Sequence, residues 1–106
     1  MSAEDQMQVV ILRGIINDDD FMRKVIPFVD PVYFEGVYRP LYMTLVKFVA
    51  KYNKIPTLET FGIYLPEAGT FVGDISEGMT VMPALFDKTP VDDEWLLDAT
   101  EKWCQD

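Results

Sequence analysis

Histidine is absent from this 106-residue chain, and cysteine occurs once, at Cys104. Without histidine there is no Ser-His-Asp or Cys-His arrangement for nucleophilic catalysis and no imidazole ligand for zinc. A single cysteine forms neither an internal disulfide nor a cysteine-rich metal site, and it is typical of a reducing compartment. We therefore expect a cytoplasmic protein that carries no catalytic residue, metal or other cofactor of its own.

Targeting and nucleotide-binding signals are lacking as well. The first five residues are acidic and have neither the basic start nor the cleavage site of a signal peptide. No apolar run approaches the ~20 residues that a membrane span needs. Neither G-x-x-x-x-G-K-[ST] nor G-x-G-x-x-G occurs, so no phosphate-cradling loop is present. These residues are predicted to contain neither a membrane anchor nor a nucleotide-driven motor.

The composition that remains is that of a folded acidic domain. Hydrophobic residues make up 49% of the chain and aromatic residues 13%, which suffices for a packed interior. Division of 106 residues into two units would leave each too small for a core, so residues 1–106 are predicted to form one domain. The net charge of −9 repels phosphate backbones and argues against non-specific nucleic-acid binding by the whole surface.

Turn residues divide the first third of the chain into short helices. Residues 3–16 predict a buried helix because acidic residues open it, although its β-branched second half taken alone would suit a strand. The acidic run at residues 18–20 supplies turn and N-cap chemistry. The short helix that follows should place three apolar side chains on one side: Phe21, Val25 and Phe28.

The clearest helical pattern begins at Pro40. It follows residues 30–36, where Pro31 and Gly36 indicate a turn or a single helical turn. Asn53 is the expected C-cap. Between these limits one apolar face extends over three turns and comprises Leu41, Leu45, Phe48, Val49 and Tyr52.

The next two segments are less regular. Thr57 should cap a helix that Pro66 stops, followed by a loop over residues 66–74 and a weak helix over residues 75–85. The buried side of the capped helix is predicted to hold Leu58, Phe61 and Leu65.

A final helix is predicted after Thr89 as its N-cap and Pro90 at its first position. Its apolar residues Trp95, Ala99 and Trp103 recur every four positions, beside Leu96. No glycine or proline closes this helix before Asp106, so we expect the sequence to be a piece of a longer protein. The fold class predicted is all-α, a compact bundle of about five to six short helices.

Two acidic groups raise the question of a metal site. Residues 18–20 lack the spaced ligands and bidentate glutamate of a calcium loop, so helix capping is favoured. Asp92, Asp93, Glu94 and Asp98 would suit acid–base or two-metal chemistry, but they open a helix, whose dipole favours carboxylates. Metal-dependent hydrolysis through Asp92, Asp93 and Asp98 is therefore the least favoured hypothesis.

Two sets of residues are candidates for partner binding. Lys47, Lys51 and Lys54 follow the i, i+4, i+7 spacing and form a basic stripe, which is either a solvated face or a contact for an acidic partner or a phosphate. Trp95 and Trp103 belong either to the core or to a contact with a neighbouring element or molecule.

Several stretches, in order, resemble the N-terminal domain of DnaB-type replicative helicases. Residues 3–18, acidic and glutamine-containing before Val10-Ile11-Leu12-Arg13-Gly14, are similar to the first helix of that family. Residues 21–34 resemble its second helix and the "D-x-x-Y-F" turn, and residues 40–65 its helix, "Y-x-x-x-P-[ST]" connection and next helix. Residues 93–103 are similar to the branch from T-even-like phages, whereas residues 69–83 depart from the family.

The resemblance implies a role in DNA replication without chemistry in this chain. The parent would be a ring-shaped helicase, with its motor domain, ATP and magnesium beyond Asp106, in the cytoplasm of a bacterial host. This domain would belong to the collar that assembles the hexamer and docks primase in the primosome, and single-stranded DNA would be met only through the ring. In the family a following helical hairpin makes the main collar dimer, so this domain alone should be monomeric or associate weakly.

Two other hypotheses are compatible with the same sequence. The helicase-binding domain of a primase has a similar helical fold, and a small free-standing phage protein would act as a protein-binding module. The reading frame beyond Asp106 distinguishes them, because only the helicase hypothesis requires a downstream motor with a G-K-[ST] loop.

Burial of Leu45 and Phe48 tests the predicted face of the central helix. The substitution Phe48→Ala should lower the free energy of unfolding by about 3–5 kcal/mol, because it removes a large buried ring and leaves a cavity. Denaturant unfolding measures the difference, and an unchanged stability would mean that the helix faces the other way.

Overall fold

The computed structural model describes residues 3–71, 74–88 and 92–104, without the side chains of residues 3–5 and 93. Every regular element within these ranges is helical, so the all-α prediction is confirmed. The elements in chain order are α1 (Ala3–Asn17), α2 (Asp19–Val25), the short 3-10 helix η1 (Pro31–Tyr33), α3 (Tyr38–Tyr52), α4 (Leu58–Glu67), α5 (Ser76–Leu85) and α6 (Asp93–Trp103).

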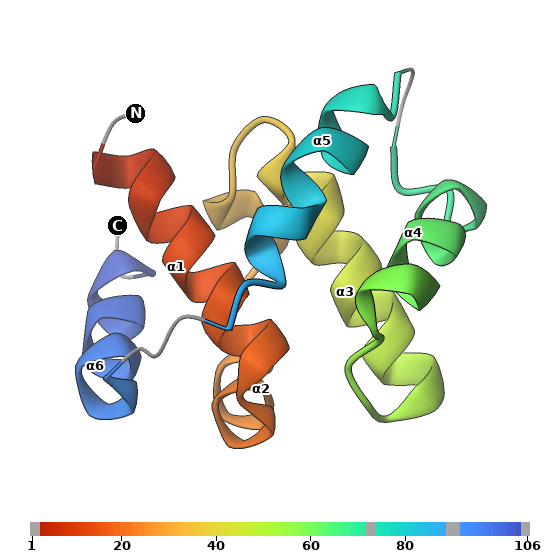
Figure 1. The fold of residues 1–106 in the computed structure, drawn as a ribbon. Coiled ribbons are helices and arrows are strands. Elements are labelled where there is room, and N and C mark those ends of the chain that lie inside the picture. The colour runs from red at the N-terminus through yellow and green to blue at the C-terminus, as the bar shows by residue number, and fades with distance from the viewer. Residues whose placement is uncertain (1–2, 72–73, 89–91, 105–106) are drawn as a thin grey trace.

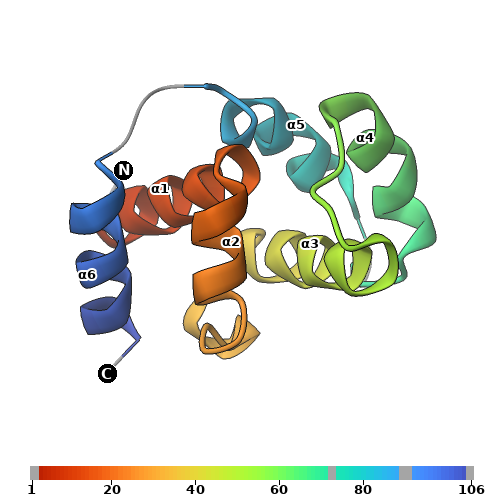
Figure 2. The same ribbon diagram turned by 90° about the horizontal axis from the view of Figure 1, so that it is seen from below.

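The first helix occupies the centre of the arrangement. It packs against α2, α3, α5 and α6, while α4 packs against α5 at the other side of the molecule (Figure 1). Both views place α6 at one end of the molecule and α4, with the end of α3, at the opposite end (Figures 1 and 2). The fold therefore has two ends that are built from different helices.

Helix α1 is buried because its second half is apolar on most sides. Ile11, Leu12 and Ile15 are completely enclosed by the surrounding helices. Gly14 allows α6 to approach closely, since a Cβ atom at this position would lie 2.6 Å from the Cδ2 atom of Leu96. The predicted buried helix is confirmed, and the strand alternative for its second half is wrong.

Short polar side chains cap the helices as the sequence predicts. Asp18 accepts a hydrogen bond from the backbone N–H of Phe21 at the start of α2, and Thr57 accepts one from Thr60 at the start of α4, each at 3.2 Å. Asn53 ends α3 in the left-handed conformation at φ 58°. Local sequence thus sets where these helices begin and end.

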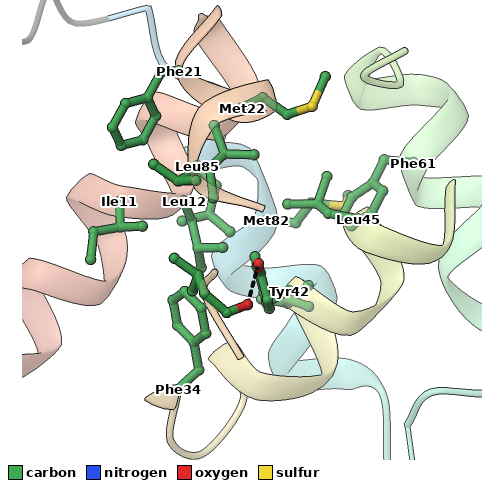
Figure 3. Close-up of a cluster of buried hydrophobic side chains, with 14 of the residues drawn as sticks. Ile11, Leu12, Phe21, Met22, Phe34, Tyr42, Leu45, Phe61, Met82 and Leu85 are labelled. Carbon is green, nitrogen blue, oxygen red and sulfur yellow. Dashed lines mark hydrogen bonds between the residues drawn. The ribbon is translucent and has the colours of Figure 1, made fainter. Parts of the chain in front are cut away.

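The core contains side chains from all six α-helices and from Phe34, which follows η1 (Figure 3). The rings of Phe34 and Tyr42 lie 4.6 Å apart, and the Tyr42 hydroxyl donates a hydrogen bond of 2.7 Å to the carbonyl oxygen of Val29. Burial, with smaller effects from Cys104 and Asp30, raises the pKa of Tyr42 well above its ordinary value. Leu45 and Phe48 are buried as predicted.

Three residues predicted to lie on buried faces are exposed. Phe28 follows the end of α2, where the turn at residues 26–28 directs it away from Phe21 and Val25. Tyr52 and Leu58 are the last residue of α3 and the first of α4, where neighbouring helices no longer cover the surface. For Phe28 the helix ends before the predicted pattern does, whereas Tyr52 and Leu58 lie in helices as predicted but are not covered by a neighbouring helix.

Prolines limit the helices less sharply than predicted. Helix α3 begins at Tyr38, two residues before Pro40. A proline is tolerated there because the N–H groups in the first turn of a helix have no acceptor within the helix. Helix α4 runs past Pro66 to Glu67, and the N–H of Ala68 still bonds to the carbonyl oxygen of Tyr64 at 2.9 Å. The predicted loop at residues 66–74 therefore starts two residues later, and its residues 72–73 lie outside the described part.

The last two helices combine one confirmed and one corrected prediction. The weak helix is present as α5, and it contains Pro83 near its end. Thr89 and Pro90 lie outside the described residues, and α6 begins only at Asp93. Its N-cap is Asp92, which accepts a hydrogen bond of 3.3 Å from the N–H of Trp95. The prediction of Thr89 as the cap of this helix is wrong because a second capping residue lies closer to the helix.

The buried hydroxyl of Tyr42 provides a test of the core. Tyr42→Phe should lower the free energy of unfolding by about 1–3 kcal/mol near pH 8, because the carbonyl oxygen of Val29 loses its donor. Above a pH of about 10 the unfolded chain ionises Tyr42 while the folded chain keeps it neutral, so the wild type loses stability as the pH rises.

The variant lacks this ionisation, so the stability difference between the two proteins should shrink between about pH 8 and about pH 11. Urea unfolding at both pH values measures it, and the other titrating groups serve as an internal control because both proteins share them. A difference that stays constant or grows would contradict the burial of the hydroxyl.

Candidate functional site

The three lysines of the predicted basic stripe have different environments. The Nζ atom of Lys47 donates a hydrogen bond of 2.6 Å to the carbonyl oxygen of Ala68, which follows the last residue of α4. A cation at this position also suits the negative end of the α4 dipole. Lys47 therefore connects α3 to the end of α4 and has a structural role that the spacing of the lysines did not reveal.

The other two lysines remain on the surface near the end of α3. The Nζ atom of Lys51 lies 5.3 Å from the centroid of the Tyr52 ring, within the range of a cation–π interaction. Lys54 is exposed and lines a groove beside that ring. The predicted stripe is thus reduced to Lys51 and Lys54, and a partner for them stays a prediction.

A groove of about 620 Å³ lies between the end of α3, the connection at residues 53–57 and α4. The ring of Phe48 forms part of its lining, with Tyr52 at 4.6 Å and Tyr64 edge-on at 5.2 Å. Ile63 on α4 also lines the groove and is 68% exposed. We refer to this feature as the α3–α4 groove.

The sequence contained one indication of the groove, the apolar residues Tyr52 and Ile63, which are exposed in the structure. The helical periodicity concealed it, because it assigned Tyr52 to the buried face of the central helix. Both side chains are exposed at the end of the molecule that α4 and the end of α3 form (Figure 2).

The two tryptophans of α6 have opposite environments. Trp103 packs against Phe34 and Tyr33, with ring centroids 5.0 Å and 5.9 Å away. Leu96 and Thr100 are buried beside it, so the inner face of α6 follows positions 96, 100 and 103. Trp95 lies off this face and is 55% exposed.

The core interpretation is therefore confirmed for Trp103 and wrong for Trp95. The predicted spacing of four from Trp95 through Ala99 does not coincide with the buried face, because α6 is rotated so that Leu96 meets Gly14 of α1. Beside Trp95, the exposed residues Glu94 and Asp98 make this side of the helix acidic. We refer to Glu94, Trp95 and Asp98 as the Trp95 face.

The acidic groups serve the helix ends. Asp18 and Asp92 accept capping hydrogen bonds, and Asp19 forms an ion pair of 2.8 Å with Arg23, so the capping interpretation of residues 18–20 is confirmed for Asp18. Over the described side chains, which leave out Asp93, no three histidine, cysteine or acidic groups come together as metal ligands. Because the side chain of Asp93 is not described, only Asp92 and Asp98 remain of the three residues in the hydrolysis hypothesis. These two residues give that hypothesis no support.

Two further observations concern the thiol of Cys104 and the length of the helices. Partial burial raises the pKa of the Cys104 thiol, which keeps it protonated and weakly nucleophilic. Across the described ranges, every helix is too short or too polar to cross a membrane.

These features define a class: a small all-α domain in which some of the exposed apolar side chains lie at opposite ends, beside the α3–α4 groove and on the Trp95 face. No family model matches the chain. The chain is, however, 29% identical over 100 residues to a protein of Enterobacteria phage T4 described as a DnaB-like replicative helicase. The resemblance to helicases of the DnaB type is thereby confirmed.

The extent of the match differs between the two proteins. It covers 93% of this chain but 21% of the phage T4 helicase. The chain therefore spans about a fifth of the length of this relative.

The environment of Lys47 gives a test that separates structural from surface lysines. Lys47→Met should lower the free energy of unfolding by about 0.5–1.5 kcal/mol, because the carbonyl oxygen of Ala68 loses its donor. The matched variants Lys51→Met and Lys54→Met should change it by less than about 0.5 kcal/mol. Chemical denaturation of the three variants measures these differences, and equal effects at all three positions would contradict the assigned role of Lys47.

Proposed function

We propose that this chain is the N-terminal collar domain of a phage replicative DNA helicase and contributes to hexamer assembly and primase docking. The proposal rests on one observation above all: similarity across 93% of the chain to a DnaB-like replicative helicase of which it matches only 21%. The absence of a phosphate-cradling loop motif from these residues agrees with a role other than nucleotide hydrolysis.

The surface supports a protein-binding role. Single exposed apolar residues are common, but the α3–α4 groove combines aromatic lining, an exposed isoleucine and adjacent lysines. Such a combination of a concave apolar surface and charged edges is typical of sites that hold another protein. An exposed tryptophan on α6 adds a side-chain type that often dominates the binding energy of interfaces.

ATP and magnesium are implied for the parent helicase and belong to its motor. The sequence contains no phosphate-cradling loop, and over the described side chains no three histidine, cysteine or acidic groups come together as metal ligands. We therefore propose that ATP and magnesium bind in the motor, and we assign no step of hydrolysis to the residues of this chain. In the proposed role the domain acts inside the host cytoplasm and meets single-stranded DNA only as part of the ring.

The proposal is tested with the chain and with a version extended through its natural downstream sequence. The chain alone should show no ATP turnover, whereas the extended protein should form oligomers in sedimentation velocity and bind its primase in a titration. A control in which the downstream P-loop lysine is replaced separates assembly from hydrolysis.

Three results would contradict the proposed function. They are ATP turnover by the 106 residues alone, an extended protein that stays monomeric at all concentrations, and a reading frame with no downstream motor. An upstream primase catalytic domain would instead favour the helicase-binding domain of a primase.

A further inference from the structure

Two surfaces of the domain are complementary to each other. The α3–α4 groove has an aromatic lining with Lys54 at one end, and the Trp95 face presents an exposed indole beside two carboxylates. They lie at opposite ends of the molecule, so they do not meet within one chain (Figures 1 and 2). We propose that the Trp95 face of one copy docks in the α3–α4 groove of a second copy.

The size and lining of the groove suit an aromatic side chain. Its volume of about 620 Å³ lies in the range of sites that enclose a ligand larger than a single indole. The rings of Tyr52 and Tyr64 present apolar surface on two sides, and Ile63 extends from α4. Trp95, 55% exposed on α6, would remove its ring from water against these groups.

Along the α3–α4 groove and along α6, charges follow one another in the same order but with opposite sign. Lys54 precedes α4 and Glu67 is its last residue, so the groove is basic at one end and acidic at the other. On α6 the acids Glu94 and Asp98 flank Trp95, and Lys102 lies one turn beyond Asp98. Glu94 and Lys102 are separated along the helix by about 12 Å, and α4 is about 15 Å long. An α6 helix laid along the groove therefore brings acids to Lys54 and Lys102 to Glu67.

A contact between two different ends of the same protein is head-to-tail. Such a contact leaves one groove and one Trp95 face unoccupied in each dimer, so it continues until the assembly closes into a ring or grows as a filament. This contact deepens the assembly role in the proposed function and rests on that role for its place in the parent protein. It requires no motor domain and no primase.

The contact is expected to be weak between free domains. Each copy carries a net charge of −9, and the resulting repulsion opposes association until salt screens it. A single aromatic anchor with a few rim charges corresponds to a dissociation constant on the order of 0.1–1 mM. Tethering in a larger assembly raises the effective concentration into this range.

Complementation between two blocked variants tests the contact. Trp95→Ala removes the anchor and keeps the groove, whereas Ile63→Arg blocks the groove and keeps the anchor. Each variant alone should associate at least about tenfold more weakly than the wild type in sedimentation velocity over about 0.05–1 mM. An equal mixture should form dimers, because one intact groove and one intact Trp95 face remain, and should form nothing larger.

The controls separate this contact from misfolding and from general surface effects. Both substituted side chains are mostly exposed, so circular dichroism melting curves should match the wild type. Val32→Arg is the matched control for Ile63→Arg, since Val32 is 64% exposed and belongs to neither surface. This variant should associate like the wild type.

Four outcomes would overturn the proposal. They are a wild-type chain that stays monomeric at about 1 mM, association that neither variant weakens, loss of association in the Val32→Arg control, and a mixture that forms no dimer. A chain of 106 residues that stays monomeric, beside an extended protein that oligomerises, would reject this contact and leave the proposed function standing. A monomeric wild type whose groove amides shift in NMR with oligothymidylate or with an unrelated acidic helical peptide would assign the groove to that ligand instead.

Discussion

The burial of α1 is the constraint on which most of the structure depends. Ile11, Leu12 and Ile15 are fully buried, and Val9, Val10 and Ile16 pack partly against the same core, so other helices must enclose most of the second half of this helix. Helices α2, α3, α5 and α6 do so, and Gly14 allows α6 to approach within contact of the backbone of α1. The rotation of α6 about its axis follows from this contact, which places Leu96 inside and Trp95 outside.

A central buried helix has a consequence for the ends of the molecule. Helices that cover α1 cannot also cover one another completely, so the end of α3 with α4 and the outer side of α6 keep apolar groups at the surface. Lys47 closes part of one end by binding the carbonyl oxygen of Ala68, but the groove beside it stays open. The surfaces available for partners are thus a result of how the core is built.

Local and non-local features were predictable to different degrees. Helix boundaries at Asp18, Asn53 and Thr57 were predicted well, because capping involves hydrogen bonds between residues no more than four apart. The predicted roles of Lys47 and Trp95 were incomplete or wrong, since each depends on a group distant in the chain, the carbonyl of Ala68 and the approach of Gly14. The groove was not predicted, because its lining comes from two helices and their connection.

By itself, the sequence determined the all-α class, the order of the helices and the absence of a phosphate loop, and its resemblance to DnaB-type helicases was confirmed by direct comparison. These properties depend on residue type and short-range periodicity, which act before the chain is folded. Only the tertiary structure decided which tryptophan is buried, which lysine bonds to the end of another helix and where a groove remains. Those outcomes depend on how helices distant in sequence rotate and cover one another when they enclose α1.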